Sequence, residues 1–283
     1  MPSAGNNAEV KAVWGLVRAC HPEPTIAVTL AAVALAVASG RDAPGVVAVG
    51  LAILTGQLSV GWLNDAVDAE RDRVTHRPDK PITAGVVSRR SVGVAAAVAA
   101  ALCVPASFLS GFPAGVAHIA AVASAWTYNL KLKSTALSVL PYAVSFGLLP
   151  AFVVLGLPGH PAPAPWLVAA GALLGSGAHF ANVLPDLDDD AATGVRGLPH
   201  RLGARASELA AAALLLAAST VLVLGPPGPP TPLGWAGLAA AVTVLTIGFA
   251  VGHRRRSRAV FRAVLLVAVI DVLLLVVAGI RIR

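Results

Sequence analysis

Nine apolar runs, each close to twenty residues long, constrain this chain more than any other feature of its sequence. About twenty residues of helix, rising ~1.5 Å per residue, cross the ~30 Å hydrocarbon core of a bilayer. Charged residues make up only 12% of the 283, so few polar groups interrupt these runs. We therefore expect an all-α, polytopic membrane protein built as a bundle of nine transmembrane helices.

The runs are rich in Ala, Val, Leu and Gly, and short loops separate them. Small side chains let helices approach closely in lipid, where packing holds a bundle together. The predicted spans cover residues 24–40, 44–63, 91–110, 114–130, 136–157, 164–183, 206–224, 232–251 and 259–280. Because they form one series, we expect residues 1–283 to make a single transmembrane domain.

The basic residues fall into alternate loops, which indicates an orientation by the positive-inside rule. All but three of the 21 Lys and Arg residues lie on the same side as the N-terminus, and the exceptions are Arg41, Arg281 and Arg283. We therefore expect an integral protein of a bacterial inner (plasma) membrane with a cytoplasmic N-terminus. This orientation and contact with membrane lipid account for the net charge of +7, so no nucleic-acid partner is expected.

Acidic residues are rare, yet eight of the fourteen Asp and Glu residues gather in two clusters at the ends of apolar runs. The first cluster lies within residues 64–72 and the second within residues 182–190. Ionised carboxylates beside hydrocarbon are costly unless they are paired, bound to metal or in contact with water. Two such clusters on one predicted side of the membrane indicate a divalent-metal site facing the cytoplasm.

If each preceding span continues as a helix, the acidic side chains of a cluster line one face of that helix. The positions that repeat in this way are Asn64 or Asp65, Asp68 and Asp72 in the first cluster, and Asn182, Asp186 and Asp190 in the second. Rows of oxygen ligands suit Mg2+, which is commonly shared between carboxylates and the phosphate oxygens of a substrate. We therefore expect a phosphorylated ligand, and the similar spacing suggests two pseudo-repeated halves.

Basic residues follow both acidic clusters within one or two helical turns. A diphosphate needs both signs of charge, because metal ions bridge some of its oxygens while Arg or Lys neutralise the others. Candidates for this contact, with a tyrosine from the loop after the fourth span, are Arg77, Lys80, Tyr128, Lys131, Lys133, Arg196 and Arg201. The competing interpretation is two solvated loops with weak surface ion pairs, which the matching positions of the clusters disfavour.

At this point the residues resemble the UbiA-type intramembrane prenyltransferases. The first signature of that family, NDxxDxxxD, is met by Asn64, Asp65, Asp68 and Asp72. The continuation over residues 77–85 resembles the RPxxPIxxG loop of the family. The first acidic cluster and its loop are therefore similar to the first aspartate motif.

Two further elements carry the resemblance across the chain. Asp186 and Asp190 are similar to the second aspartate motif of the family. Tyr128 with Lys131 and Lys133 resembles its YxxxK element, although the lysines lie three and five residues after the tyrosine. Either lysine can therefore take the role of the family's lysine.

The resemblance implies Mg2+-dependent transfer of a prenyl group from a prenyl diphosphate to an aromatic or quinone-precursor acceptor within the membrane. It assigns metal binding and catalysis to Asp65, Asp68, Asp72, Asp186 and Asp190, and contacts with metal waters or phosphate oxygens to Asn64 and Asn182. Hydroxybenzoate, dihydroxynaphthoate, homogentisate, a phosphoribosyl donor and specialised metabolites all remain open as acceptors, as do prenyl length and oligomeric state.

Two alternatives to prenyl transfer remain open at this stage. A terpene cyclase on the same scaffold would capture the carbocation with the double bonds of the donor itself. A transporter would use carboxylates as a cation site, but the acids here lie at the ends of the predicted spans. Asp271 is the exception, because it lies in the middle of the ninth span and serves either a function or helix packing.

Overall fold

The computed structural model describes residues 4–75, 78, 80–255 and 259–280, and every regular element within these ranges is a helix. The all-α prediction is therefore confirmed. In chain order the elements are α1 (Ala4–Ala19), α2 (Pro22–Ala38), α3 (Ala43–Val74), α4 (Arg89–Phe108), α5 (Phe112–Leu130), η1 (Leu132–Ser134), α6 (Val139–Leu155), α7 (Pro165–Val183), η2 (Leu184–Asp186), α8 (Leu187–Ala192), α9 (Leu198–Leu202), α10 (Ala204–Leu224), α11 (Pro232–Arg255) and α12 (Ala259–Gly279).

Each of the nine predicted runs coincides with a helix, but the count of nine transmembrane helices is not confirmed. Among the described residues, 6 helices are long and apolar enough to cross a membrane, and a bent pair formed by α1 and α2 raises the number to 7. The helices α2 and α6 contain only 17 residues each. They fall short of the about twenty residues that a bilayer core requires of an untilted helix.

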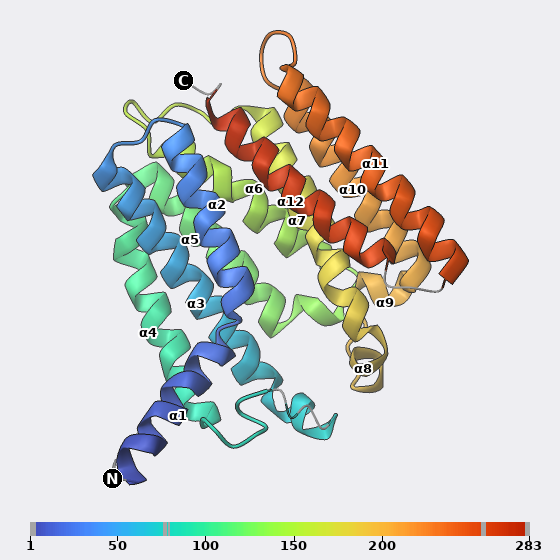
Figure 1. The fold of residues 1–283 in the computed structure, drawn as a ribbon. Coiled ribbons are helices and arrows are strands. Elements are labelled where there is room, and N and C mark those ends of the chain that lie inside the picture. Colours follow the sequence, from blue (N-terminus) through green and yellow to red (C-terminus); the bar gives the residue numbers. More distant parts are fainter. Residues whose placement is uncertain (1–3, 76–77, 79, 256–258, 281–283) are drawn as a thin grey trace.

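The long helices pack as one bundle, with α2 to α5 on one side, α10 to α12 on the other, and α6 and α7 between them (Figure 1). One apolar core joins α2, α3, α5, α6, α7, α10 and α12 around the fully buried Phe152. A second core joins α7, α10, α11 and α12 around Leu215. Because α7 and α12 contribute to both cores, they connect the two sides of the bundle.

The helix α3 runs without interruption from its predicted span through the first acidic cluster. Asp42 caps its start by accepting a hydrogen bond from the Gly45 amide at 3.0 Å, and Pro44 occupies its first turn. Its 32 residues span about 48 Å, which exceeds a bilayer core of about 30 Å. The helix is therefore longer than an untilted span requires, and its C-terminal turns carry the acidic cluster.

The helix before the second acidic cluster behaves differently, because α7 ends at Val183 and the chain passes through η2 into the short α8. Pro185 lies at this break, where it lacks an amide hydrogen and its ring hinders a regular helix. The expected continuous face over Asn182, Asp186 and Asp190 is therefore wrong, since these residues lie on three successive elements. The C-terminal end of α3 and the short helices α8 and α9 nevertheless lie at the same end of the bundle (Figure 1).

Candidate functional site

The carboxylates of the first acidic cluster are almost completely buried near the C-terminal end of α3. Asp65, Asp68 and Asp72 are only 2%, 5% and 6% exposed. Their spacing along a continuous helix turns all three toward the interior of the bundle, while Asn64 beside them is half-buried. Carboxylates in such surroundings require partners of opposite charge or a bound cation.

Asp65 meets two nitrogen atoms from other segments of the chain. Lys80, in the loop after α3, donates a hydrogen bond from Nζ to Asp65 Oδ1 at 2.7 Å. His21, between α1 and α2, places Nε2 2.9 Å from the same oxygen. One carboxylate therefore connects α3 to the N-terminal segment and to the loop that follows the first cluster.

Asp68 is paired at both of its oxygens. Lys133, on η1, donates to Oδ1, and Arg71, one turn further along α3, donates from Nη2 to Oδ2 at 2.8 Å. Burial lowers the pKa of Lys133, and the charge of Asp68 opposes that shift. The lysine and the arginine thus lie where they could exchange this carboxylate for the phosphate oxygens of a ligand.

Arg71 also connects the first acidic cluster to the second. Its Nη1 lies 3.5 Å from Oδ1 of Asp190, which α8 carries, and the Asp190 side chain is 18% exposed. His200, on α9, places Nε2 3.5 Å from the other oxygen of Asp190. Burial raises the pKa of Asp190, and the charge of Arg71 opposes this shift. Carboxylates that are distant in sequence therefore share one cation.

The other members of the second cluster are less enclosed. Asp186 on η2 is half-buried, and Asn182 on α7 is exposed, with its Nδ2 donating to Tyr142 Oη at 3.5 Å. The side chains of Asp188 and Asp189 lie outside the described part of the structure. The second cluster therefore presents its polar groups on a more open surface than α3 does.

Four rings form an aromatic group beside these polar residues. Tyr128 packs edge-on against Tyr142 with centroids 5.1 Å apart, and Tyr142 stacks with Phe146 at 6.2 Å. His179 lies 4.9 Å from Tyr142 and 5.6 Å from Tyr128. We call Tyr128, Tyr142, Phe146 and His179 the aromatic group. It joins α5, α6 and α7 next to Asn182.

A polar contact through Ser138 fixes the loop that carries Lys133. Ser138 Oγ lies 3.0 Å from His179 Nε2 and accepts a hydrogen bond from the Leu198 amide at 2.9 Å. Gly197 packs so closely that a Cβ atom there would lie 2.6 Å from the Lys133 carbonyl oxygen. The segment before α9 therefore packs directly against the backbone of Lys133.

Several basic residues expected at the site do not join these contacts. Lys131, Arg196 and Arg201 are exposed, and Arg201 donates from Nε to the Arg196 carbonyl at 3.1 Å. Arg77 lies outside the described residues. Of the two candidate lysines, Lys133 is the one that reaches Asp68.

Three residues at this site were not among those assigned to ligand contact, although Arg71 is one of the cations that follow the first cluster. Arg71 follows Asp68 by three positions, a spacing that places two side chains on neighbouring parts of a helix. His21 precedes Pro22 at the start of a span, and His200 follows the second cluster. For the two histidines no local pattern in the sequence indicates contact with Asp65 or Asp190.

The chemistry of these donors fits Mg2+, although the described side chains include no group of three His, Cys, Asp or Glu residues that could hold a metal ion by themselves. Magnesium commonly uses one or two protein carboxylates and completes its six oxygens with water and substrate phosphates. The α3 carboxylates supply such oxygens, and the cations between the two clusters match the remaining charge of a diphosphate.

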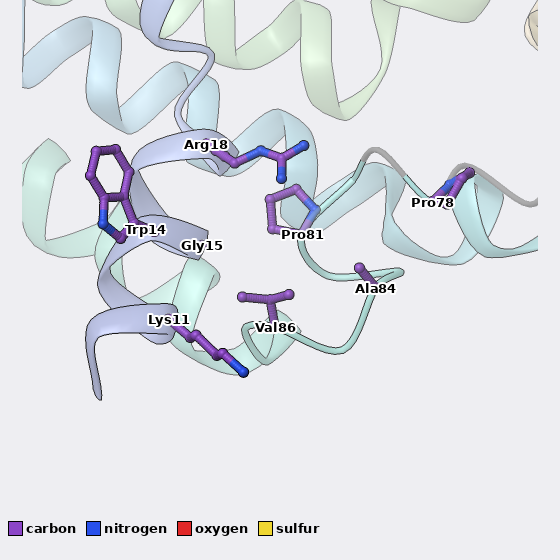
Figure 2. A pocket seen from close by; sticks show the side chains of 8 residues that line it. All are labelled: Lys11, Trp14, Gly15, Arg18, Pro78, Pro81, Ala84 and Val86. Atoms are coloured by element: carbon purple, nitrogen blue, oxygen red, sulfur yellow. The ribbon is translucent and has the colours of Figure 1, made fainter. Parts of the chain in front are cut away.

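A separate pocket of about 160 Å³ lies between α1 and the segment that follows the first cluster. Figure 2 shows its lining, which includes Lys11, Trp14 and Arg18 from α1 and Pro81 and Val86 from the facing segment. Among the described residues of this lining, Lys11 and Arg18 are basic.

Comparisons with known proteins agree with this architecture. Residues 25–275 match the UbiA prenyltransferase family. An apo UbiA homolog from Aeropyrum pernix K1 is similar in structure, with 22% identity over 88% of this chain and 95% of that one and a TM-score of 0.71. A UbiA homolog from Archaeoglobus fulgidus bound to GPP and Mg2+ has 14% identity over 93% and 99%, with a TM-score of 0.67.

A third similar structure concerns digeranylgeranylglyceryl phosphate synthase in membranes, with 17% identity over 95% of this chain and 99% of that one and a TM-score of 0.70. At these identities the structural likeness shows the fold alone. No curated protein sequence gives a significant match.

Proposed function

The chain belongs to the UbiA prenyltransferase family, and on that premise we propose that it transfers a prenyl group from a prenyl diphosphate to an aromatic or quinone-precursor acceptor, with Mg2+ as cofactor. Its apolar helices and its family make it an integral membrane protein. The observation that carries the proposal is the contact of Arg71 with both Asp68 and Asp190. It unites the two acidic clusters in one site where a diphosphate meets carboxylates and cations together.

The carboxylates that would hold Mg2+ are Asp65, Asp68, Asp72, Asp186 and Asp190, and Asn64 and Asn182 would orient metal waters or phosphate oxygens. Bound Mg2+ supplies positive charge that stabilises a departing diphosphate. Lys80, Lys133 and Arg71 supply the remaining positive charge, because each already lies against a carboxylate and can turn to a phosphate oxygen instead.

The reaction follows from these charges. The bond between the allylic carbon and the diphosphate oxygen breaks, and its electron pair leaves with the diphosphate. An electron pair of the acceptor then forms the new bond to the allylic carbocation, and the acceptor releases a proton to water. The aromatic group lies beside the polar site, where the ring faces can stabilise a carbocation and the side chains exclude water.

We further infer that all nine helices at the predicted positions lie within the membrane, in a bacterial inner membrane with the site facing the cytoplasm. The helices α2, α5 and α6 pack among longer helices of the bundle, which supports their placement beside them in lipid. A tilted or shorter helix is accommodated by local bilayer thinning at modest cost. The basic loops at the end of the bundle that carries the acidic clusters support the orientation.

The test offers the purified protein in lipid nanodiscs a panel of prenyl diphosphates of increasing length, each with and without aromatic acceptors and Mg2+. We expect Mg2+-dependent release of diphosphate and an acceptor whose mass increases by one prenyl group. A cyclised prenyl product formed from the donor alone would instead identify a terpene cyclase. The absence of diphosphate release with every donor would overturn the proposal.

A further inference from the structure

His21 lies at the joint between α1 and α2, whose axes differ in direction by 62°. Its backbone adopts φ 55° and ψ 70°, in the left-handed region that residues other than glycine rarely occupy. Such strained conformations persist where surrounding contacts impose them, and they concentrate at functional sites. The joint therefore holds His21 in an orientation that a relaxed backbone would not give.

The side chain of His21 reaches across to α3. Its Nε2 lies 2.9 Å from Asp65 Oδ1, and because a carboxylate only accepts hydrogen bonds, Nε2 must carry the hydrogen. Lys80 Nζ donates to the same oxygen and lies 3.4 Å from His21 Nε2. Two donors from different segments thus converge on one oxygen atom of Asp65.

The close packing of the joint against α3 explains why the His21 side chain contacts Asp65. A Cβ atom at Gly61 would overlap the carbonyl oxygen of Cys20, so the glycine lets the joint lie directly on α3. Thr25 donates from Oγ1 to that carbonyl at 2.9 Å, and Trp62 donates from Nε1 to the Leu16 carbonyl at 2.8 Å. Gly61 precedes Asp65 by four residues, so both lie on the same strip of α3.

We propose that His21 is a positioning residue, which donates its Nε2 hydrogen to Asp65 and so fixes that carboxylate for Mg2+ and the diphosphate. This inference rests on the proposed function, since it assigns His21 to the same site. Residues that hydrogen-bond a metal-binding carboxylate set its orientation, and their loss weakens metal affinity by about 10–100-fold. His21 lies outside both aspartate motifs, so it adds the joint between α1 and α2 to the site.

The variants separate the side chain from the backbone turn. His21→Gly keeps the left-handed turn but removes the donor, and His21→Asn tolerates the same turn with a side chain too short to reach Asp65. His21→Gln restores an N–H group at a similar distance from the backbone. His160→Gly is the matched control, because His160 is the other described residue besides glycine with positive φ (49°), and it lies exposed in the loop between α6 and α7.

The measurement is Mn2+ binding to the purified protein with geranyl diphosphate, followed by electron paramagnetic resonance. We expect Mn2+ affinity to fall about tenfold or more in His21→Gly and His21→Asn, to recover in His21→Gln, and to stay unchanged in His160→Gly. The Mg2+ concentration for half-maximal turnover should shift in parallel, while kcat at saturating Mg2+ changes less.

The outcomes that would overturn the role of His21 differ from the outcome that would overturn the proposed function. Wild-type affinity in His21→Gly or His21→Asn would overturn the role of His21 and leave the proposed function intact. Equal losses in His21→Gln and His21→Gly, with a lowered melting temperature in both, would also overturn it, because the residue would then act through the fold. A wild-type protein that binds no Mn2+ with geranyl diphosphate or with any longer prenyl diphosphate would remove the proposed function itself.

Discussion

The two acidic clusters share nearly the same spacing in sequence, yet the structure gives them different surroundings. The first lies on the uninterrupted helix α3, and its three carboxylates are at most 6% exposed. The second is divided among α7, η2 and α8, and Asp190 is 18% exposed. Equal spacing thus produces one buried face only where the backbone stays helical, and Pro185 prevents this in the second cluster.

The partners of the two clusters differ as well. In the first, Lys80 and Lys133 come from other segments and lie against Asp65 and Asp68. In the second, Asp190 has Arg71 and His200 at the longer distance of 3.5 Å. The carboxylates of the first cluster are therefore held more tightly by their partners than those of the second. Substitutions in the first cluster should accordingly lower activity more than substitutions in the second.

The largest expected effect is that of Asp68→Asn. The substitution keeps the size of the side chain but leaves Lys133 and Arg71 buried against a neutral group, so we expect kcat/KM to fall roughly 10²–10³-fold. Asp186→Asn, in the half-buried second cluster, should lower it by roughly 10–100-fold. Steady-state assays of diphosphate release measure both, with size-exclusion profiles as the control for folding. Equal losses would contradict the distinction between the clusters.

Lys133→Met should have the next largest effect. The variant removes a cation that we place at the diphosphate, so KM for the prenyl diphosphate should rise by roughly 30-fold, which corresponds to about 2 kcal/mol. Lys131→Met is the matched control, because Lys131 is exposed two residues away and should stay near wild type. A larger effect at Lys131 would show that the other lysine binds the donor.

Pro185→Ala would make the second cluster more like the first. A residue that can continue α7 should draw Asp190 away from Arg71, so we expect kcat to fall about tenfold with little change in melting temperature. Pro105→Ala, within α4, removes a proline from another helix and should leave kcat unchanged. Wild-type activity in Pro185→Ala would mean that the break in α7 does not position the second cluster.

Arg201→Ala should have the smallest effect. Its guanidinium is exposed and donates to the Arg196 carbonyl, and substitutions at such surface positions change free energies by about 0.5 kcal/mol or less. We expect kcat/KM to change less than about twofold. A loss comparable with that of Lys133→Met would place Arg201 among the residues that contact the diphosphate when a ligand is bound.

The sequence by itself determined the helical character, the positions of the long helices and the two acidic clusters. Apolar runs of this length form helices in lipid because the backbone can satisfy its hydrogen bonds only within the helix, and this requirement is local to each run. The shared face of Asp65, Asp68 and Asp72 on a continuous α3 followed from the same local periodicity, since no proline interrupts that cluster.

Only the tertiary structure decided which side chains meet. Three contacts illustrate this: Arg71 with Asp190, Lys133 rather than Lys131 with Asp68, and His21 with Asp65. The two residues of each contact are far apart in sequence, and the number of residues between them does not indicate how close they lie in space. These contacts depend on how helices pack, on the break at Pro185 and on the close approach that Gly61 permits. Charge and spacing name candidate partners, but packing selects among them because it alone fixes which helix ends lie together.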